Sequence, residues 1–152
     1  MDNMIKVYII DDEAITRNGI KEYINWEFLN ANVVGLGKNG REVLEYLEES
    51  EIDLLITDIR MPEIDGLELI DRITKLKKKI RVIIITAHRE FSYAHKAIKY
   101  ECVDDFILKP INSQELSLSI ESSIKKINEA KFKAGFSKLN KDLMKEYQKS
   151  FY

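Results

Sequence analysis

The stretch Ile52-Asp53-Leu54-Leu55-Ile56-Thr57-Asp58 decides how the rest of the chain is interpreted. It contains a short apolar run without the alternation of a half-exposed strand, which is typical of a strand buried on both faces of a sheet. Runs of the same kind recur at four other places: Ile5–Ile10, Val33–Leu36, Ile80–Ile85 and Val103–Leu108. The sequence therefore predicts five strands, most of them buried on both faces.

Segments with the spacing of an amphipathic helix lie between these runs and after the last one. Apolar residues mark five such segments: Ala14–Ile24, with Ile15, Ile20 and Tyr23 on the apolar face, Val43–Leu47, Leu69–Leu76, Phe91–Ile98 and Leu116–Ile127. Asp65-Gly66, and Asn112 with Glu115, are typical of helix starts. Alternating strands and helices predict an α/β fold, a three-layer (βα)5 architecture with a doubly wound, flavodoxin-like parallel sheet of order 2-1-3-4-5.

Composition limits the classes of function. The 152 residues, 45% hydrophobic and 33% charged, suit one folded domain and argue against disorder. The 24 basic and 26 acidic residues give a net charge of -2, which makes no case for direct binding to nucleic acid or to a membrane. The single cysteine, Cys102, and the lack of a signal peptide or of an apolar run near the ~20 residues that span a bilayer indicate a cytoplasmic location.

The chain beyond Ile127 differs from what precedes it. From Lys126 to Tyr152 there are seven lysines and three acids, a net charge of +4, which leaves -6 for residues 1–125. We expect a domain over residues 1–127 and a helical extension over residues 128–152, in which Gly135 costs about 1 kcal/mol of helix propensity. The extension would pair with another copy or another domain, or form a self-packed tail. Its apolar residues are mostly four apart: Phe132, Phe136, Leu139, Leu143, Tyr147 and Phe151.

Polar residues follow four of the predicted strands. Asp11-Asp12-Glu13, Thr57-Asp58, Thr86 and Lys109-Pro110 all come at strand ends. Because parallel strands end at one edge of a sheet, these groups should converge there, with Asp11 and Asp12 beside Asp58. A set of carboxylates without His or Cys favours a hard cation such as Mg²⁺. Carboxylates, Mg²⁺, a hydroxyl and a lysine are the parts of a phosphoryl-transfer site, in which an Asp can form an acyl phosphate.

This ordered set of residues resembles the receiver domain of two-component response regulators, the CheY-like family, over residues 4 to about 127. Four segments are similar to the subgroup of receivers that often precede AraC-type DNA-binding domains: Asp58–Gly66, Ile24–Glu27, Phe91–Ala94 and Asp105–Pro110. No block that resembles such an output domain follows residue 127. The chain is therefore interpreted as a receiver with its linker or as a stand-alone receiver.

The resemblance implies roles for the acidic residues. Asp58 would be the phosphoacceptor that attacks a phosphohistidine on a sensor histidine kinase. Asp12 would bind Mg²⁺ directly and Asp11 largely through water, with Asp58 and the backbone carbonyl of Arg60 as further ligands. Mg²⁺ is thus the implied cofactor.

The resemblance also implies a switch. Lys109 would pair with Asp58 or its phosphate, and the Lys109-Pro110 peptide would be cis. Thr86 would bond a phosphoryl oxygen and allow Phe106 to change rotamer, which would alter the face made by the fourth helix, fifth strand and fifth helix. That face, or the C-terminal helix, is expected to form a homodimer or to control a transcriptional output. DNA would be bound only by an output domain that this chain lacks.

Two features depart from the family pattern. The segment Tyr100–Val103 lacks the small residue usual near the end of the fourth helix, and the interval from Thr86 to Phe106 is longer by one residue than the family pattern. We expect the end of the fourth helix to be extended or bulged there. Phe106 also replaces the commoner Tyr, so a switch contact through a phenolic oxygen should be missing.

Two rival functions remain on sequence grounds. A receiver-like module could act in protein binding without phosphorylation, although such modules generally lack part of the acidic set. A Mg²⁺-dependent phosphohydrolase could also form an aspartyl phosphate, but its nucleophile usually follows the first strand in an Asp-x-Asp pattern that Asp11-Asp12-Glu13 lacks. A receiver has only self-catalysed phosphorylation and dephosphorylation, so no enzyme with an external turnover substrate is expected.

Overall fold

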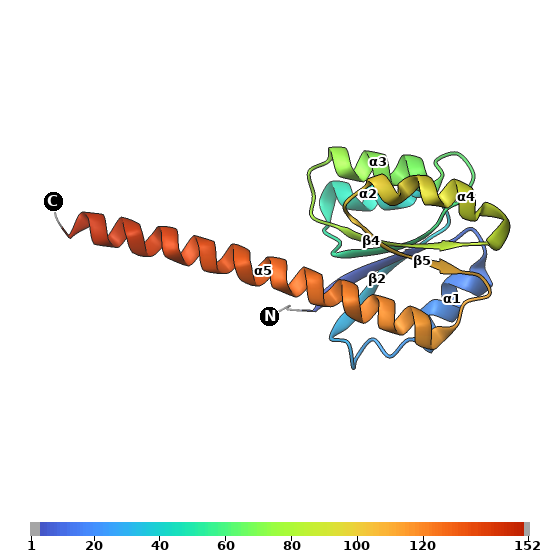
Figure 1. Cartoon of the computed structure of the whole chain (residues 1–152), viewed down its shortest axis with the longest axis horizontal. Coiled ribbons are helices and arrows are strands. Elements are labelled where there is room, and N and C mark those ends of the chain that lie inside the picture. Colours follow the sequence, from blue (N-terminus) through green and yellow to red (C-terminus); the bar gives the residue numbers. More distant parts are fainter. Residues whose placement is uncertain (1–3, 151–152) are drawn as a thin grey trace.

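The computed structural model describes residues 4–150 and contains a five-stranded sheet with helices on both faces (Figure 1). The strands are β1 (Ile5–Ile10), β2 (Ala31–Gly37), β3 (Leu54–Asp58), β4 (Arg81–Thr86) and β5 (Val103–Leu108). The α-helices are α1 (Ala14–Tyr23), α2 (Gly40–Glu49), α3 (Gly66–Lys75), α4 (Phe91–Ala94) and α5 (Ser113–Lys149), and two 3₁₀ segments, η1 (His88–Glu90) and η2 (His95–Lys99), flank α4.

The sheet is parallel throughout and its order is β2-β1-β3-β4-β5, which confirms the predicted fold class. The helices α1 and α5 cover one face, and α2, α3 and the short α4 region cover the other (Figure 1). Each face has its own apolar core, because successive residues of the inner strands point to opposite sides. Leu54 and Ile56 belong to one core and Leu55 belongs to the other, all with no exposed surface.

Side-chain caps begin three of the helices. The side chains of Asn39, Asp65 and Asn112 each accept a hydrogen bond from the backbone N–H three residues later, at 3.0–3.1 Å. Such a cap typically contributes about 1 kcal/mol to helix stability. The predicted starts at Asp65 and Asn112 are confirmed.

The expected apolar face of α1 was wrong at two positions. Ile20 and Ile24 are buried, whereas Ile15 and Tyr23 are 89% and 77% exposed. At about 100° per residue, Ile15 lies on the far side of the helix from Ile20. Only part of the periodic pattern therefore faces the sheet, and the rest is exposed surface.

The predicted fourth helical segment is present, but most of it is not α-helical. Only Phe91–Ala94 is α-helical, and 3₁₀ segments precede and follow it. The buried residues Ala94 and Ala97 are three positions apart, a spacing that a 3₁₀-helix places on one side as well as an α-helix does. Ile98, which the sequence pattern assigned to the apolar face, is 63% exposed.

The sequence pattern predicted that the extra residue between Thr86 and Phe106 lies at the end of the fourth helix. In the structure it lies in β5. Val103 pairs with Val82, but the next pair along β4 joins Ile83 to Asp105. Asp104 is therefore the additional residue of a bulge in the parallel pair. Asp104 is held in this position by its contacts with Ser123 and Lys126 of α5.

The fifth helix continues without a break from Ser113 to Lys149, so the expected helical extension after Ile127 is a continuation of α5 and not a separate helix. Its 37 residues correspond to about 55 Å, and its C-terminal half extends away from the body of the molecule (Figure 1). One ion pair ties this half to the sheet domain, between Lys131 Nζ and Asp53 Oδ1 at 3.2 Å. Phe151 lies outside the described residues, and none of the described helices is long and apolar enough to cross a membrane.

Candidate functional site

The predicted polar residues meet at the carboxyl edge of the sheet. Asp11 directly follows β1, Asp58 ends β3, Thr86 ends β4 and Lys109 directly follows β5. The ammonium of Lys109 lies 3.1 Å from Asp11 Oδ2 and 3.2 Å from Asp58 Oδ2, so one cation joins the ends of three strands. The Lys109–Pro110 peptide bond is cis.

Asp58 is a buried carboxylate with two different oxygens. It is 6% exposed, and its Oδ1 accepts a hydrogen bond from the backbone N–H of Ile59 at 2.8 Å. Its Oδ2 accepts a hydrogen bond from Lys109 at 3.2 Å. Burial raises the pKa of Asp58 above its usual value, although the charge and hydrogen bond of Lys109 act in the opposite direction. Oδ2 is the oxygen that backbone donors leave available.

Asp11 is even more deeply buried, at 1% exposure. Its Oδ1 accepts a hydrogen bond from the backbone N–H of Glu13 at 2.9 Å, whereas Oδ2 has only the ion pair with Lys109 and no aligned hydrogen bond. Burial, together with the nearby charge of Asp58, raises the pKa of Asp11 to about 6, although the backbone hydrogen bond from Glu13 and the contact with Lys109 act in the opposite direction. A buried carboxylate oxygen without a donor fits a site that takes a cation or its bound water.

Three carboxylates provide candidate ligands for such a cation. Oxygens of Asp11, Asp12 and Glu13 lie within 4.8 Å of one another, and Asp12 and Glu13 are exposed. Sequence reasoning named Asp11, Asp12 and Asp58 and missed Glu13, although the acidic run Asp-Asp-Glu was visible. An all-oxygen set of this kind suits a hard ion such as Mg²⁺.

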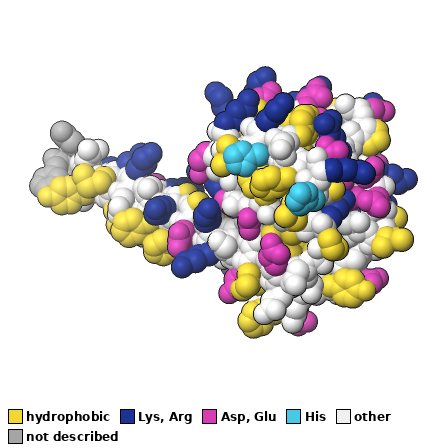
Figure 2. All heavy atoms as spheres, turned by 45° about the vertical axis from the view of Figure 1, so that its right-hand side comes forward, with side chains coloured by type: hydrophobic (Ala, Val, Ile, Leu, Met, Phe, Trp, Pro, Cys, Tyr) yellow, Lys and Arg dark blue, Asp and Glu magenta, His cyan; other side chains and the backbone are white. Residues whose placement is uncertain are grey.

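The expected switch residues occupy the neighbouring strands. Thr86 is fully buried, and its hydroxyl donates to the carbonyl oxygen of Ala87 at 3.1 Å. Phe106 is half-buried, and its ring lies 6.4 Å from that of Phe91 and 6.2 Å from that of His95, with the His95 ring stacked on it. Figure 2 shows histidine side chains beside hydrophobic ones on this surface. An aromatic cluster thus joins β5 to α4 and η2.

Arg60 connects the loop after β3 to the α4 region. Its Nε donates to Glu90 Oε2 at 2.9 Å, and its guanidinium carbon lies 3.8 Å from the centre of the Tyr93 ring. The Tyr93 hydroxyl donates to Asp65 at the start of α3. Sequence reasoning did not predict these contacts of the Arg60 side chain, because nothing in the sequence pairs residues about thirty positions apart.

A third carboxylate with a buried side chain, that of Asp104 at 5% exposure, was also missed. Its oxygens accept hydrogen bonds from Arg81 Nε at 3.2 Å, Ser123 Oγ at 2.7 Å and Lys126 Nζ at 3.0 Å. Burial alone would raise the pKa of Asp104, but these hydrogen bonds lower it below its usual value. The bulge of β5 therefore fastens α5 to the sheet at the edge opposite Asp58.

The response regulator receiver domain profile matches residues 7–121. An uncharacterized transcriptional regulatory protein, YesN of Bacillus subtilis, is 37% identical over 121 residues, which are 80% of this chain and 33% of YesN. The transcriptional regulatory protein HptR of Staphylococcus aureus is 33% identical over 134 residues, 88% of this chain and 52% of HptR. The chain thus spans about a third to a half of these relatives.

Solved structures of response regulators are also similar to this chain. The receiver domain of AraT, a response regulator from Geobacillus stearothermophilus, is 38% identical with a TM-score of 0.79, covering 84% of this chain and 98% of that one. A two-component transcriptional regulator AraC from Clostridium phytofermentans is 30% identical with a TM-score of 0.76, covering 82% and 96%. These neighbours are consistent with the AraC-associated subgroup. The chain belongs to the family of response regulator receiver domains.

Proposed function

We propose that this receiver is a phosphorylation-dependent switch in which Asp58 accepts a phosphoryl group from the phosphohistidine of a sensor histidine kinase. One observation carries the proposal: Asp58 Oδ2 lies 3.2 Å from the Lys109 ammonium at the end of β3, beside the carboxylates that follow β1. The carboxylate, the cation and the acidic cluster together form an arrangement suited to phosphoryl transfer.

The transfer forms one bond and breaks one bond. Asp58 Oδ2 bonds to phosphorus while the bond from phosphorus to the imidazole nitrogen breaks, and that nitrogen keeps the electron pair. The backbone N–H of Ile59 holds Oδ1 and so fixes the orientation of the carboxylate. Lys109 neutralises negative charge on the phosphoryl oxygens, which is the main catalytic contribution that a protein makes to such a transfer.

Mg²⁺ is the proposed cofactor. Asp11, Asp12 and Asp58 would hold it together with the backbone carbonyl of Arg60, and Glu13 supplies a further carboxylate beside Asp12. The buried Oδ2 of Asp11, which has no aligned hydrogen bond, fits this assignment. When bound, the ion supplies positive charge next to the transferred group.

The output would pass through Thr86 and Phe106. The Thr86 hydroxyl, which donates to Ala87, would turn to a phosphoryl oxygen, and the Phe106 ring would then leave its packing against Phe91 and His95. Because Phe106 has no hydroxyl, its signal depends on ring packing alone. Residues 128–152 are proposed to be a linker toward a DNA-binding output domain, by analogy with the transcriptional regulators that the chain resembles.

Amide hydrogen exchange tests the switch. The wild-type chain and Asp58→Asn would be incubated with Mg²⁺ and a small acyl phosphate donor. We expect exchange to change in residues 88–99 and 103–108 of the wild-type chain only. Equal exchange in both proteins would contradict the proposal. Repeated hydrolysis of a generic phosphoester, with more than one product molecule per chain, would indicate a phosphohydrolase instead.

A further inference from the structure

A hollow of about 620 Å³ opens at the edge of the sheet where the strands begin, at the end of the domain opposite Asp58. Four parts of the chain line it: the residues before β3, the loop from α3 to β4, the turn before β5 and the part of α5 that leaves the domain. Its floor is made by four buried apolar side chains, Ile52, Ile73, Ile80 and Ile127. Small-molecule sites are typically hollows of about 300–1,000 Å³ with an apolar lining and a few polar groups. We call this hollow the amino-edge basin.

Ion pairs and hydrogen bonds hold the walls of the amino-edge basin in place. Lys131 of α5 pairs with Asp53 before β3 at 3.2 Å, and Asp53 also accepts a hydrogen bond from the backbone N–H of Lys6 at 2.8 Å. Arg81 of β4 pairs with Glu101 before β5 at 3.1 Å, and it donates to the carbonyl oxygen of Glu101 at 2.8 Å. The basin is therefore preformed, so a ligand would not lose affinity to the ordering of its walls.

Basic residues outnumber acidic ones around the basin. Five basic side chains line it: Lys78, Lys79, Arg81, Lys126 and Lys131. Three acidic side chains line it as well, and Asp104, which accepts hydrogen bonds from Arg81 and Lys126, is a fourth acid beside them. One positive charge is thus in excess. Because residues 1–125 carry a net charge of -6, the basin is a positive site on a negative domain.

Two of these lysines have no carboxylate partner in the part of the chain that the structure describes. The Nζ of Lys78 donates to the carbonyl oxygen of Leu47 at 2.7 Å, and the side chain of Lys79 forms neither a hydrogen bond nor an ion pair among residues 4–150. Both lie in the loop from α3 to β4. Among the acids that line the basin, Glu51 also has no ion pair in that part of the chain, so one positive charge stays without a counter-charge.

We propose that the amino-edge basin binds a small organic monoanion with an apolar body, such as an aromatic carboxylate. The apolar body would lie on the isoleucine floor and the carboxylate would face Lys78 and Lys79, so that one negative charge balances the one positive charge in excess. The basin lies where α5 leaves the domain (Figure 1), so the bound molecule would contact the sheet and α5 together. This inference does not depend on phosphorylation of Asp58.

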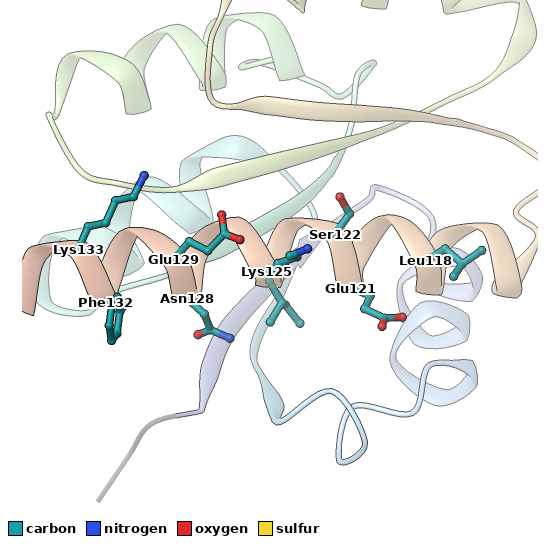
Figure 3. Close-up of a pocket in the computed structure, with 9 residues that line it drawn as sticks. Leu118, Glu121, Ser122, Lys125, Asn128, Glu129, Phe132 and Lys133 are labelled. Atoms are coloured by element: carbon teal, nitrogen blue, oxygen red, sulfur yellow. The ribbon is translucent and has the colours of Figure 1, made fainter.

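A second hollow on α5 provides a comparison within the same molecule. Figure 3 shows Lys125, Glu129 and Phe132 along a shallow groove of about 900 Å³ whose lining residues all belong to α5. Lys125 and Ile127 of the basin floor are two positions apart and therefore point about 200° apart around the helix axis. Because no other element walls this outer groove, it would enclose less of a small molecule than the basin does. We therefore expect the anion to prefer the basin.

Amide chemical shifts of the whole chain, with Mg²⁺ chelated and naphthalenecarboxylate as the probe, test the inference. We expect saturable shifts in residues 73–81, 101–103 and 126–131, with half-saturation at or below about 1 mM. Naphthalenecarboxamide, which lacks the charge, and acetate, which lacks the apolar body, should each bind at least about tenfold more weakly. The absence of saturable shifts with the probe up to about 10 mM, or equal binding of the three compounds, would overturn the proposal.

Two pairs of variants locate the site, all at exposed positions where the fold should be kept. Lys79→Glu should raise the dissociation constant of the probe at least about fivefold, whereas Lys125→Glu, which changes the net charge equally, should leave it within about twofold. Ala130→Phe places a ring at the lining of the basin and should abolish binding, whereas Ala134→Phe, about one turn further along α5, should not. Binding that Lys125→Glu weakens and Lys79→Glu leaves unchanged would place the probe in the outer groove and overturn the proposal.

Discussion

The carboxyl edge of the sheet buries charged groups, whereas the projecting part of α5 exposes apolar ones. At the sheet edge, Asp11 and Asp58 hold carboxylates at 1% and 6% exposure, although buried charge is unfavourable. On the projecting helix, Phe132 and Leu143 are 75% and 57% exposed, although apolar surface in water is unfavourable. Both regions contain groups that the chain does not satisfy alone. The first suits a cation and a phosphoryl group, and the second suits another helix.

The largest expected effect is a dependence of stability on pH that arises from the buried carboxylates. With Mg²⁺ chelated, the free energy of unfolding should fall as the pH rises from about 4 to about 7. Asp11 has a pKa of about 6 in the folded chain against an ordinary value of 3.8, so the unfolded chain releases this proton first and is stabilised. The difference between these two pKa values corresponds to roughly 3 kcal/mol of the free energy of unfolding. This contribution is lost in full at pH values above the pKa of the folded chain.

Urea unfolding at several pH values would measure this effect. Asp71 and Asp104, whose pKa values are lowered, contribute stability that is lost only on acidification below the same window, so they do not mask it. Asp11→Asn should flatten the dependence, and Mg²⁺ should reduce it. A stability that increases with pH across the window would contradict our description of the site.

The second prediction concerns Asp104, a carboxylate whose two oxygens both accept hydrogen bonds, and contrasts it with Asp11 and Asp58 at the sheet edge. Asp104→Ala removes the acceptor of Lys126 and one of the two acidic partners of Arg81, which keeps only Glu101, and should lower the free energy of unfolding by about 2 kcal/mol. Chemical denaturation measures this change. Glu101→Ala is the control, because the Glu101 side chain is 90% exposed although it also pairs with Arg81. Equal effects of the two substitutions would refute a structural role for Asp104.

Neutralising a carboxylate at the sheet edge should raise the free energy of unfolding, whereas Asp104→Ala should lower it. In the absence of Mg²⁺, Asp58→Asn should raise the free energy of unfolding at neutral pH by about 1 kcal/mol, because burial disfavours the ionised carboxylate. Lys109 keeps Asp11 as a partner in this variant. Thermal unfolding with a chelator would measure the gain. A loss of stability would mean that the Asp58–Lys109 pair stabilises the fold more than burial destabilises it.

The smallest effect concerns the projecting helix. Gly135→Ala should stabilise this helix locally by about 1 kcal/mol, because a methyl group there meets no atom within 4 Å and alanine has the higher helix propensity. Amide exchange in residues 130–142 should slow, while exchange in β3 and β4 stays unchanged. Faster exchange in the variant would indicate that Gly135 serves a contact absent from the described structure.

The sequence predicted much of the site because its geometry follows from topology. Parallel strands end on one edge, so Asp11, Asp58 and Lys109 had to meet once the strands were located. The spacing of Asn112 and Glu115, which is typical of a helix cap, separately placed the start of α5. These predictions depended on residues at strand and helix ends, where sequence position and spatial position are closely linked.

Other features were beyond sequence reasoning. The three-residue spacing of Ala94 and Ala97 suits both kinds of helix, so the short α4 and its 3₁₀ flanks were not distinguished. The location of the bulge depends on the register of β4 against β5 and on the contacts of Asp104. The contact of Arg60 with Tyr93 joins separate elements that no local pattern relates.

The most direct test of the central claim is the intact mass of the chain after incubation with Mg²⁺ and a small acyl phosphate donor. We predict that the wild-type chain gains one phosphoryl group, that chelation of Mg²⁺ prevents the gain, and that Asp58→Asn gains none. A wild-type chain that stays unmodified in the presence of Mg²⁺, or an Asp58→Asn chain that is modified equally, would contradict the assignment of Asp58 as the phosphoacceptor.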